Sequence, residues 1–288
     1  MSVDSAAKLY YVPHGTRWPI VGSVGLFALM TGAALWLNQI ELGVWLLLLG
    51  LVLLVTMLTG WFATVIYESE SGAYNEQVDH SFRWGMSWFI FSEVVFFGVF
   101  FGALFYARQW IVPWLAGEGD NFFTNVLLWP GFENSWPSAG PAQGPVERMG
   151  AWGIPAINTA ILLTSGVTIT IAHHMLLANR RRSLIFWLAA TFVLGFVFIA
   201  LQAEEYIHAY TELDLRLDTG IYGATFFMLT GFHGLHVTLG AIMLVVIWLR
   251  VLRGHFTPQR HFAFEAVAWY WHFVDVVWLG LFFFVYWL

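Results

Sequence analysis

Histidines and acidic residues that could do chemistry lie within stretches of the sequence that are otherwise apolar. His233 and His236 are three positions apart in TGFHGLHVTLG, and His272 and Asp275 have the same spacing in WYWHFVDVVW. Residues three apart share one face of a helix. Imidazoles that converge from neighbouring helices could bind a haem or a metal ion. Hydrogen bonding between packed helices is the alternative, and the spacing alone leaves both interpretations open.

Glu93 is the single acidic residue in the apolar run GMSWFIFSEVVFFGVFF. A carboxylate loses its hydration at such a position, so we expect a protonated or hydrogen-bonded carboxyl. One interpretation is a carboxyl that exchanges protons or contacts a partner. The other is a hydrogen-bonded packing residue with no further role.

Two further pairs of residues give weaker signals. Glu205 and His208 form a Glu-x-x-His pair, which is half of a carboxylate-bridged di-iron signature. The chain contains no second such pair, so we do not expect a di-iron site. His173 and His174 are adjacent, and adjacent side chains on a helix point about 100° apart. We therefore expect both to be hydrogen-bonded near the membrane interface and not to share a ligand.

A cationic cluster follows one of the apolar runs. It consists of Arg250, Arg253 and His255, and Trp61 and Glu68 end another run at the same level. Cationic side chains at this depth suit a lipid phosphate. Snorkelling anchors without a bound lipid are the alternative.

The composition indicates which elements must carry these residues. Of the 288 residues, 59% are apolar and 10% are charged, with a formal net charge of −6. Soluble domains carry about 25% charged residues, so the composition excludes a soluble enzyme and a disordered chain. The acidic balance excludes a nucleic-acid-binding protein. Cysteine is absent, which excludes disulfides and thiolate metal sites.

Seven runs are long enough to cross a bilayer as helices, which requires about 20 apolar residues each. They are apolar on every side, so they predict an all-α membrane protein, a seven-helix bundle. The predicted helices cover residues 18–37, 42–66, 84–106, 154–177, 184–202, 221–249 and 266–288. We expect one integral-membrane domain over 1–288. We also expect an irregular, proline-rich loop at 112–154 and a solvated acidic connection at 67–79.

The basic residues predict an orientation. Nine of the 12 Lys and Arg fall on the side of the N-terminus, and the other three fall on the opposite side. The positive-inside rule then places the N-terminus in the cytoplasm or an organelle matrix and Leu288 outside, with the 112–154 loop on the outer side. The first residues do not resemble a cleaved signal peptide, so the first span is expected to be its own insertion signal.

Six segments together resemble subunit III of the haem–copper cytochrome c oxidases, and the N-terminal segment and the long loop look more bacterial than mitochondrial. The segments are YYVPHGTRWP, GMSWFIFSEVVFF, INTAILLTSGVTITIAHH, LQAEEYIHA, IYGATFFMLTGFHGLHVTLG and HFAFEAVAWYWHFVDVVWLGLFFFVYWL. The resemblance implies a two-helix arm and a five-helix arm, separated by a V-shaped cleft filled with lipid. It also implies a chain with no catalytic residue, metal, haem or copper of its own, because the redox centres belong to partner subunits I and II. Such a chain packs against subunit I, supports proton uptake, sustains activity over many turnovers and assists oxygen entry.

The resemblance also assigns roles to particular residues. Glu93 matches the family's membrane carboxyl in the SEV motif. The structural polar positions inside the membrane are His233, His236, His272, Asp275, Glu205 and His208. The positions near a phospholipid headgroup are Trp61, Glu68, Arg250, His255 and Thr257. A guanidinium can pair a phosphate through two hydrogen bonds. Phe62-Ala63-Thr64 and Asn75 depart from residues common in the family and remove charge from this end of the cleft.

The leading hypothesis is a non-catalytic subunit of a proton-pumping oxidase in the bacterial cytoplasmic membrane. The complex would pass electrons from cytochrome c to oxygen. A quinol-oxidising complex is the close alternative, although some quinol-oxidising relatives lack the first two helices, which this chain retains. An autonomous haem-binding redox protein and a proton channel or transporter acting alone are alternatives from other classes, and we find no inverted repeat that would favour a transporter. The expected partners are oxidase subunits and membrane phospholipids, not nucleic acid.

Overall fold

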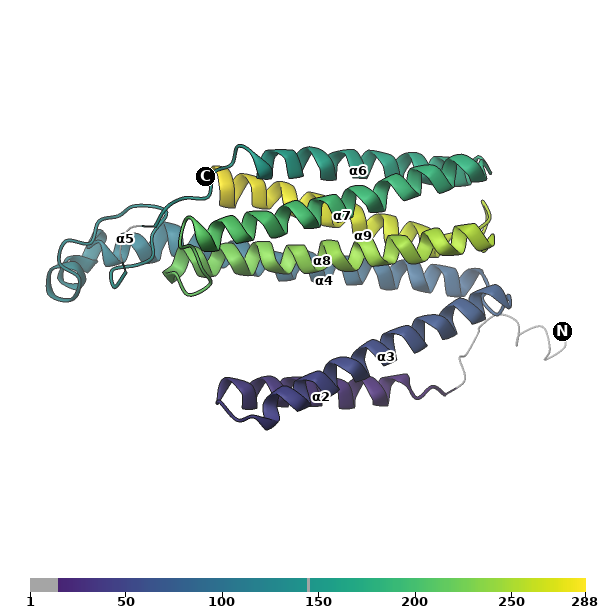
Figure 1. The fold of residues 1–288 in the computed structure, drawn as a ribbon, viewed down its shortest axis with the longest axis horizontal. Coiled ribbons are helices and arrows are strands. Elements are labelled where there is room, and N and C mark those ends of the chain that lie inside the picture. The colour runs from purple at the N-terminus through teal and green to yellow at the C-terminus, as the bar shows by residue number, and fades with distance from the viewer. Residues whose placement is uncertain (1–14, 144–145) are drawn as a thin grey trace. The chain divides into compact units, whose positions relative to one another are not determined.

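The computed structural model describes residues 15–143 and 146–288, and these residues form long helices (Figure 1). Seven helices in the described ranges are long and apolar enough to cross a membrane. They are α2 (Trp18–Leu37), α3 (Leu42–Glu70), α4 (Glu76–Tyr106), α6 (Ile154–Leu177), α7 (Arg181–Thr211), α8 (Gly220–Arg253) and α9 (Phe262–Leu281). The predicted all-α membrane fold is therefore confirmed. The predicted N-terminal lead-in, with Lys8 and the start of YYVPHGTRWP, lies largely outside the described residues, at 1–14.

The prediction of an acidic connection over 67–79 is wrong in length, because the connection is shorter. Helix α3 continues to Glu70 and α4 begins at Glu76, so only five residues join them. Asn75 caps α4, because its side-chain Oδ1 accepts a hydrogen bond from the backbone N–H of Val78 at 3.0 Å. Glu76 and Asp79 lie in the first turn, where negative charge is favourable. The acidic residues that suggested a loop therefore help to start a helix.

Several helices extend beyond their predicted apolar cores. Helix α7 covers Arg181–Thr211 where 184–202 was expected, and α8 covers Gly220–Arg253 where 221–249 was expected. The polar ends remain helical because each added turn keeps more backbone N–H and C=O groups hydrogen-bonded within the same segment. Gly254 then ends α8 with a φ of 80°, a left-handed conformation that suits glycine.

The 112–154 loop contains more structure than the irregular cap that was expected. Helix α4 continues through the π-helical turn η1 (Ala107–Ile111) into α5 (Val112–Leu115). The short turns η2 (Gly119–Asn121) and η3 (Thr124–Leu128) follow. The side-chain amide of Asn125 donates to the backbone carbonyls of Leu115, Trp129 and Phe132 at 3.0–3.2 Å. This one amide ties the start of the loop to its middle.

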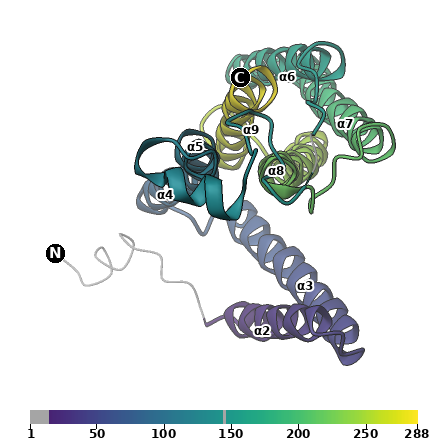
Figure 2. The same ribbon diagram turned by 90° about the vertical axis from the view of Figure 1, so that its left-hand side faces the viewer.

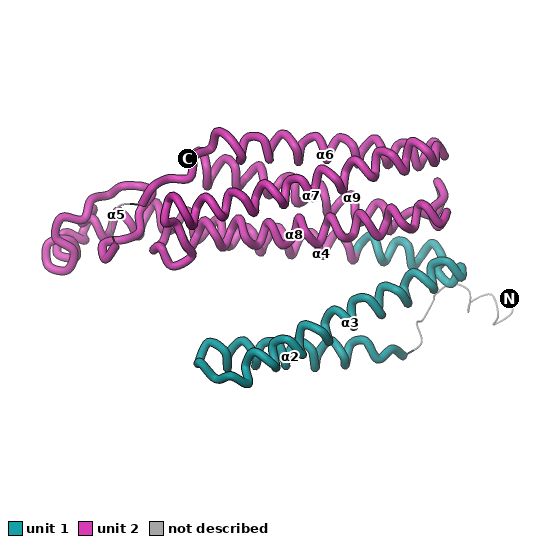
Figure 3. Tube along the Cα trace, in the orientation of Figure 1, with its two compact units in different colours: residues 1–84 teal, residues 85–288 magenta. Residues whose placement is uncertain are grey.

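The chain divides into two compact units, residues 1–84 and 85–288, and the boundary falls within α4 (Figure 3). In the first unit α2 and α3 pack against each other through glycine. A Cβ added to Gly32 would lie 2.3 Å from the backbone nitrogen of Leu47, and one added to Gly43 would lie 2.3 Å from that of Trp36. Small residues allow such close backbone approach in membrane helices. The indole N–H of Trp18 also donates to the hydroxyl of Thr64 at 3.2 Å.

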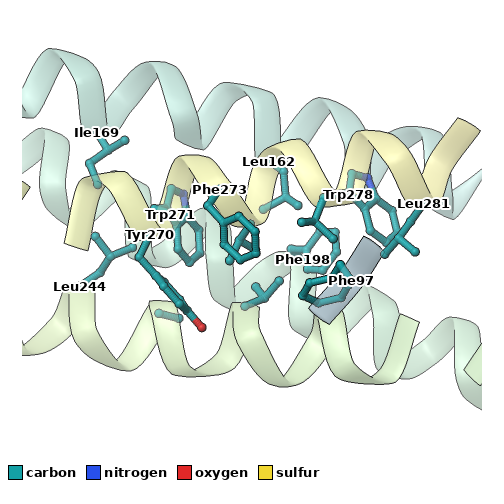
Figure 4. Close-up of a cluster of buried hydrophobic side chains, with 14 of the residues drawn as sticks. Phe97, Leu162, Ile169, Phe198, Leu244, Tyr270, Trp271, Phe273, Trp278 and Leu281 are labelled. Atoms are coloured by element: carbon teal, nitrogen blue, oxygen red, sulfur yellow. The ribbon is translucent and has the colours of Figure 1, made fainter. Parts of the chain in front are cut away.

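In the second unit, α6, α7, α8 and α9 pack in a ring, with α9 between α6 and α8 (Figure 2). Bulky side chains fill the interior, among them Trp271, Trp278 and Phe198 (Figure 4). The indole N–H groups of Trp271 and Trp278 donate to hydroxyls of α6, those of Ser165 and Thr159, each at 2.9 Å. Hydrogen bonds between helices thus supplement apolar packing, which alone gives little preference for helix contact over lipid.

Candidate functional site

Glu93 of α4 and His236 of α8 form a direct pair within the second unit. His236 Nε2 lies 3.0 Å from Glu93 Oε2, and the two side chains are 12% and 20% exposed. Aromatic rings surround the imidazole. Phe97 meets it edge-on at 5.0 Å between ring centroids, and Tyr270 stacks on it at 6.3 Å. The sequence predicted a hydrogen-bonded Glu93 but not its partner, because the two residues are 143 positions apart.

The second nitrogen of His236 determines what this pair can do. His236 Nδ1 lies 2.6 Å from the backbone carbonyl of Phe232. A carbonyl oxygen only accepts hydrogen bonds, so Nδ1 must carry a hydrogen. The contact between Nε2 and Glu93 Oε2 therefore contains one proton, held either by the carboxyl or by the imidazole. In both forms the net charge of the pair is zero.

His233 faces a different neighbour. Its side chain is almost completely buried, and Nε2 donates to the backbone carbonyl of Val274 in α9 at 3.2 Å. The imidazole lies 5.2 Å from the ring of Trp278 and 5.7 Å from that of Phe198. His233 thus joins α8 to α9, as the hydrogen-bonding interpretation expected.

His272 and Asp275 connect α9 to α6. His272 Nε2 lies 3.3 Å from the hydroxyl of Thr170, and His272 Nδ1 lies 3.8 Å from Asp275 Oδ2. The Asp275 carboxylate lies directly against Gly166, where an added Cβ would be 2.6 Å from Oδ2. The same-face spacing of His272 and Asp275 is therefore realised, and both residues contact one neighbouring helix.

Glu205 and His208 do not act together. Glu205 is buried, and its Oε1 accepts a hydrogen bond from the hydroxyl of Tyr286 at 2.6 Å. His208 Nδ1 lies 3.2 Å from Oε2 of Glu212, the residue that follows the end of α7. The Glu-x-x-His spacing therefore places the two side chains against separate partners.

The three intramembrane histidines do not converge on one point. Among the described residues, the one group of three His, Asp or Glu donors within 4.8 Å of one another consists of His173, His261 and Glu265. Sequence reasoning missed this group, because it assigned His173 to hydrogen bonding and did not consider the other two residues. His261 and Glu265 are four residues apart in HFAFE, which places them on one face of a helix, and this spacing could have indicated the group.

The residues predicted to bind lipid are divided between the two units. In the first unit, Trp61 is 46% exposed, and Glu68 accepts a hydrogen bond from the hydroxyl of Tyr74 at 2.7 Å. The assembly of one lipid site from residues of both units stays a prediction.

The second unit contains the cationic part of the predicted lipid site. Arg250 is buried, and its guanidinium lies 4.6 Å from the centroid of the Phe256 ring. The backbone of His255 donates to the Arg250 carbonyl at 3.1 Å. Thr257 and Arg260 exchange two backbone hydrogen bonds, at 3.2 and 3.1 Å. Arg250 in the last turn of α8 is thus joined by a backbone hydrogen bond to the turn after the helix, which carries His255 and Thr257.

Comparison with known proteins identifies the family. The family model described as "Cytochrome c oxidase subunit III" matches residues 8–116 and 121–288. Proteins named cytochrome c oxidase subunit 3 are similar over almost the whole chain: that of Formosania lacustris is 41% identical over 98% of this chain and 97% of its own length, and that of Squalus acanthias is 40% identical over the same shares. The chain belongs to the cytochrome c oxidase subunit III family.

Membership in the subunit III family confirms the predicted function at the level of the complex. The chain is a core subunit of a cytochrome c oxidase and associates with other subunits of that enzyme. The relatives include another vertebrate protein, from Struthio camelus, which is 38% identical. These animal proteins are mitochondrial, so they give no support to the bacterial origin expected from the sequence.

Proposed function

We propose that this subunit III carries no redox centre and supports proton uptake and the durability of the oxidase, with Glu93 and His236 as a proton-holding pair. The observation that supports this proposal is the 3.0 Å contact between His236 Nε2 and Glu93 Oε2, with His236 Nδ1 directed to the Phe232 carbonyl, because this arrangement places one proton in the contact. Transfer of this proton across the contact leaves the pair neutral. A charge isolated in apolar surroundings is costly, so a pair that stays neutral is suited to hold a proton there.

Haem and copper belong, in this proposal, to partner subunits I and II, and subunit I is the main contact. Helix α4 offers apolar surface for such a contact, since Phe91, Val94 and Val95 are each about half exposed. Cytochrome c is the proposed electron donor, because the chain retains α2 and α3. The family membership favours this donor over the quinol that the sequence left as an alternative. The composition of the purified complex, above all its subunit II, tests the assignment.

The proposed location is the cytoplasmic membrane of a bacterium, with the N-terminus inside and the C-terminus outside. The uneven distribution of Lys and Arg supports the orientation. The last part of the proposal is that the subunit binds phospholipid near Trp61, Glu68, Arg250, His255 and Thr257. Arg250 in the last turn of α8 supports the phospholipid part of the proposal, because cationic groups at a membrane surface attract anionic headgroups.

Infrared difference spectroscopy of the working oxidase tests the proton-holding pair. A Glu93→Gln variant should assemble normally, because glutamine keeps the shape and a hydrogen-bonding group. The carboxyl band that changes during turnover in the wild-type complex should be lost in this variant and retained in Ser92→Ala, an exposed neighbour on α4. If Glu93→Gln fails to co-purify with the complex, or if its carboxyl bands match the wild type, the proton-holding role is wrong.

A further inference from the structure

A cluster of two histidines and a glutamate lies where α9 begins beside α6. His173 belongs to the last turns of α6, His261 immediately precedes α9, and Glu265 lies in the first turn of α9. Glu265 Oε1 is 3.4 Å from His261 Nε2 and 3.7 Å from His173 Nε2. The rings of His173 and His261 lie 5.4 Å apart between centroids. None of these residues has a part in the proton-holding pair or in the proposed lipid site.

We propose that His173, His261 and Glu265 bind a divalent cation of the zinc class. Zinc binds imidazole nitrogen and carboxylate oxygen at about 2.0–2.2 Å in a tetrahedron, so its ligand atoms lie roughly 3.3–3.5 Å from one another. The distances of 3.4 and 3.7 Å around Glu265 Oε1 are close to this spacing. All three donor atoms lie within 4.8 Å of one another, so a small rotation of the His173 side chain completes the set.

The types of donor select the cation. Calcium and magnesium prefer sites built from oxygen, whereas two imidazoles and one carboxylate suit zinc and its neighbours in the first transition row. Three protein ligands leave a fourth position for water or for a group from another subunit.

The ring nitrogens of the cluster also point to a ligand. His173 Nε2 and His261 Nδ1 are both shielded from solvent, and neither has a hydrogen-bond partner among the described residues. A buried polar atom without a partner costs free energy, and a metal ion would provide one for His173 Nε2. The ring of Phe264 lies 5.5 Å from that of His173, which gives the site one apolar wall.

An ion can reach the cluster from the end of the unit that contains the loops at 178–180 and 254–261. The side chains of His173, Glu265 and His261 are 28%, 16% and 10% exposed. A bound ion would link the end of α6 to the start of α9 and fix the connection between α8 and α9. This connection carries Arg260 and follows Arg250 and Arg253, so the ion would also stabilise the cationic surface described above.

Zinc binding to the purified oxidase complex tests the proposal. The complex is treated with a chelator, equilibrated with Zn²⁺ and desalted, and zinc is counted by mass spectrometry against haem. We expect Glu265→Gln and His261→Gln complexes to bind one zinc ion fewer than the wild type. His174→Gln is the matched control, because His174 adjoins His173 but lies outside the cluster, and this variant should bind as much zinc as the wild type.

A cryo-electron microscopy map of the zinc-treated wild-type complex gives a readout that does not depend on variants folding. The proposal expects density between His173, His261 and Glu265 that is lost after chelation. Equal zinc content in the wild-type and Glu265→Gln complexes, or a map with no density at this position, would overturn it.

Discussion

Arg250 combines a full positive charge with burial, since only 7% of the residue is exposed. The Phe256 ring 4.6 Å from its guanidinium provides a cation–π contact, worth about 0.5–2 kcal/mol. A lipid phosphate that reaches the remaining exposed surface would meet a cation already held in place. Because the Arg250 side chain is already ordered, it loses little further conformational entropy when the lipid binds.

Replacement of Arg250 by alanine should therefore reduce the anionic phospholipid that co-purifies with the complex. Hydrogen bonds to charged groups contribute about 1.5–3 kcal/mol, which corresponds to roughly a tenfold or greater loss of affinity. Lipid mass spectrometry measures the effect. Arg216→Ala, which removes an exposed cation beyond the other end of α8, is the control and should retain the lipid. Unchanged lipid in Arg250→Ala, or an equal loss in both variants, would show that no specific phosphate site exists at Arg250.

The positions of the buried polar residues could be predicted from sequence, but their partners could not. Glu93 and His236 were both expected to be hydrogen-bonded inside the membrane, and both are. Which atoms meet depends on how distant helices pack, and helical spacing contains no such information. His261 and Glu265 were missed for the same reason, because their third member, His173, is 88 residues before His261 in sequence.

At the scale of elements, the α2–α3 hairpin depends on glycine at its contact. Gly32→Val would force side-chain atoms against the backbone of α3, because even a Cβ would lie 2.3 Å from Leu47 N. Overpacking of this kind costs about 1–3 kcal/mol. We expect the variant subunit to dissociate from the oxidase at a lower temperature than the wild type, measured by native gel analysis after heating. Ala34→Val adds similar bulk at an exposed position of α2 and should leave that temperature unchanged; equal behaviour of both variants would contradict the close contact.

The helix cores were predictable because lipid requires long apolar runs, and α2 and α6 match their expected bounds. The helix ends were less predictable. Polar residues such as Glu76 and Asp79 were taken as loop, whereas capping by Asn75 and favourable dipole interactions keep them helical. The hydrogen bonds from Trp271 and Trp278 to α6 were also not foreseen, since indole groups in apolar runs give no indication of their acceptors.

At the scale of the whole molecule, seven spans place the two ends of every helix on opposite sides of the membrane. The chain contains no cysteine, so single cysteines can report its orientation. Ala178→Cys precedes α7 and Leu217→Cys follows it, and both positions are exposed. An impermeant maleimide should label Leu217→Cys from outside intact cells and Ala178→Cys only after permeabilisation. The reverse pattern would invert the proposed topology.

Removal of the subunit from the complex tests whether this chain supports the oxidase without holding a redox centre. The complex with and without this chain is compared by its visible haem spectrum, its iron and copper content, and the number of turnovers before activity declines. We expect the same spectrum and the same iron and copper content in both preparations, with a shorter working life in the absence of the chain. Loss of haem or copper together with the chain would overturn this supporting role.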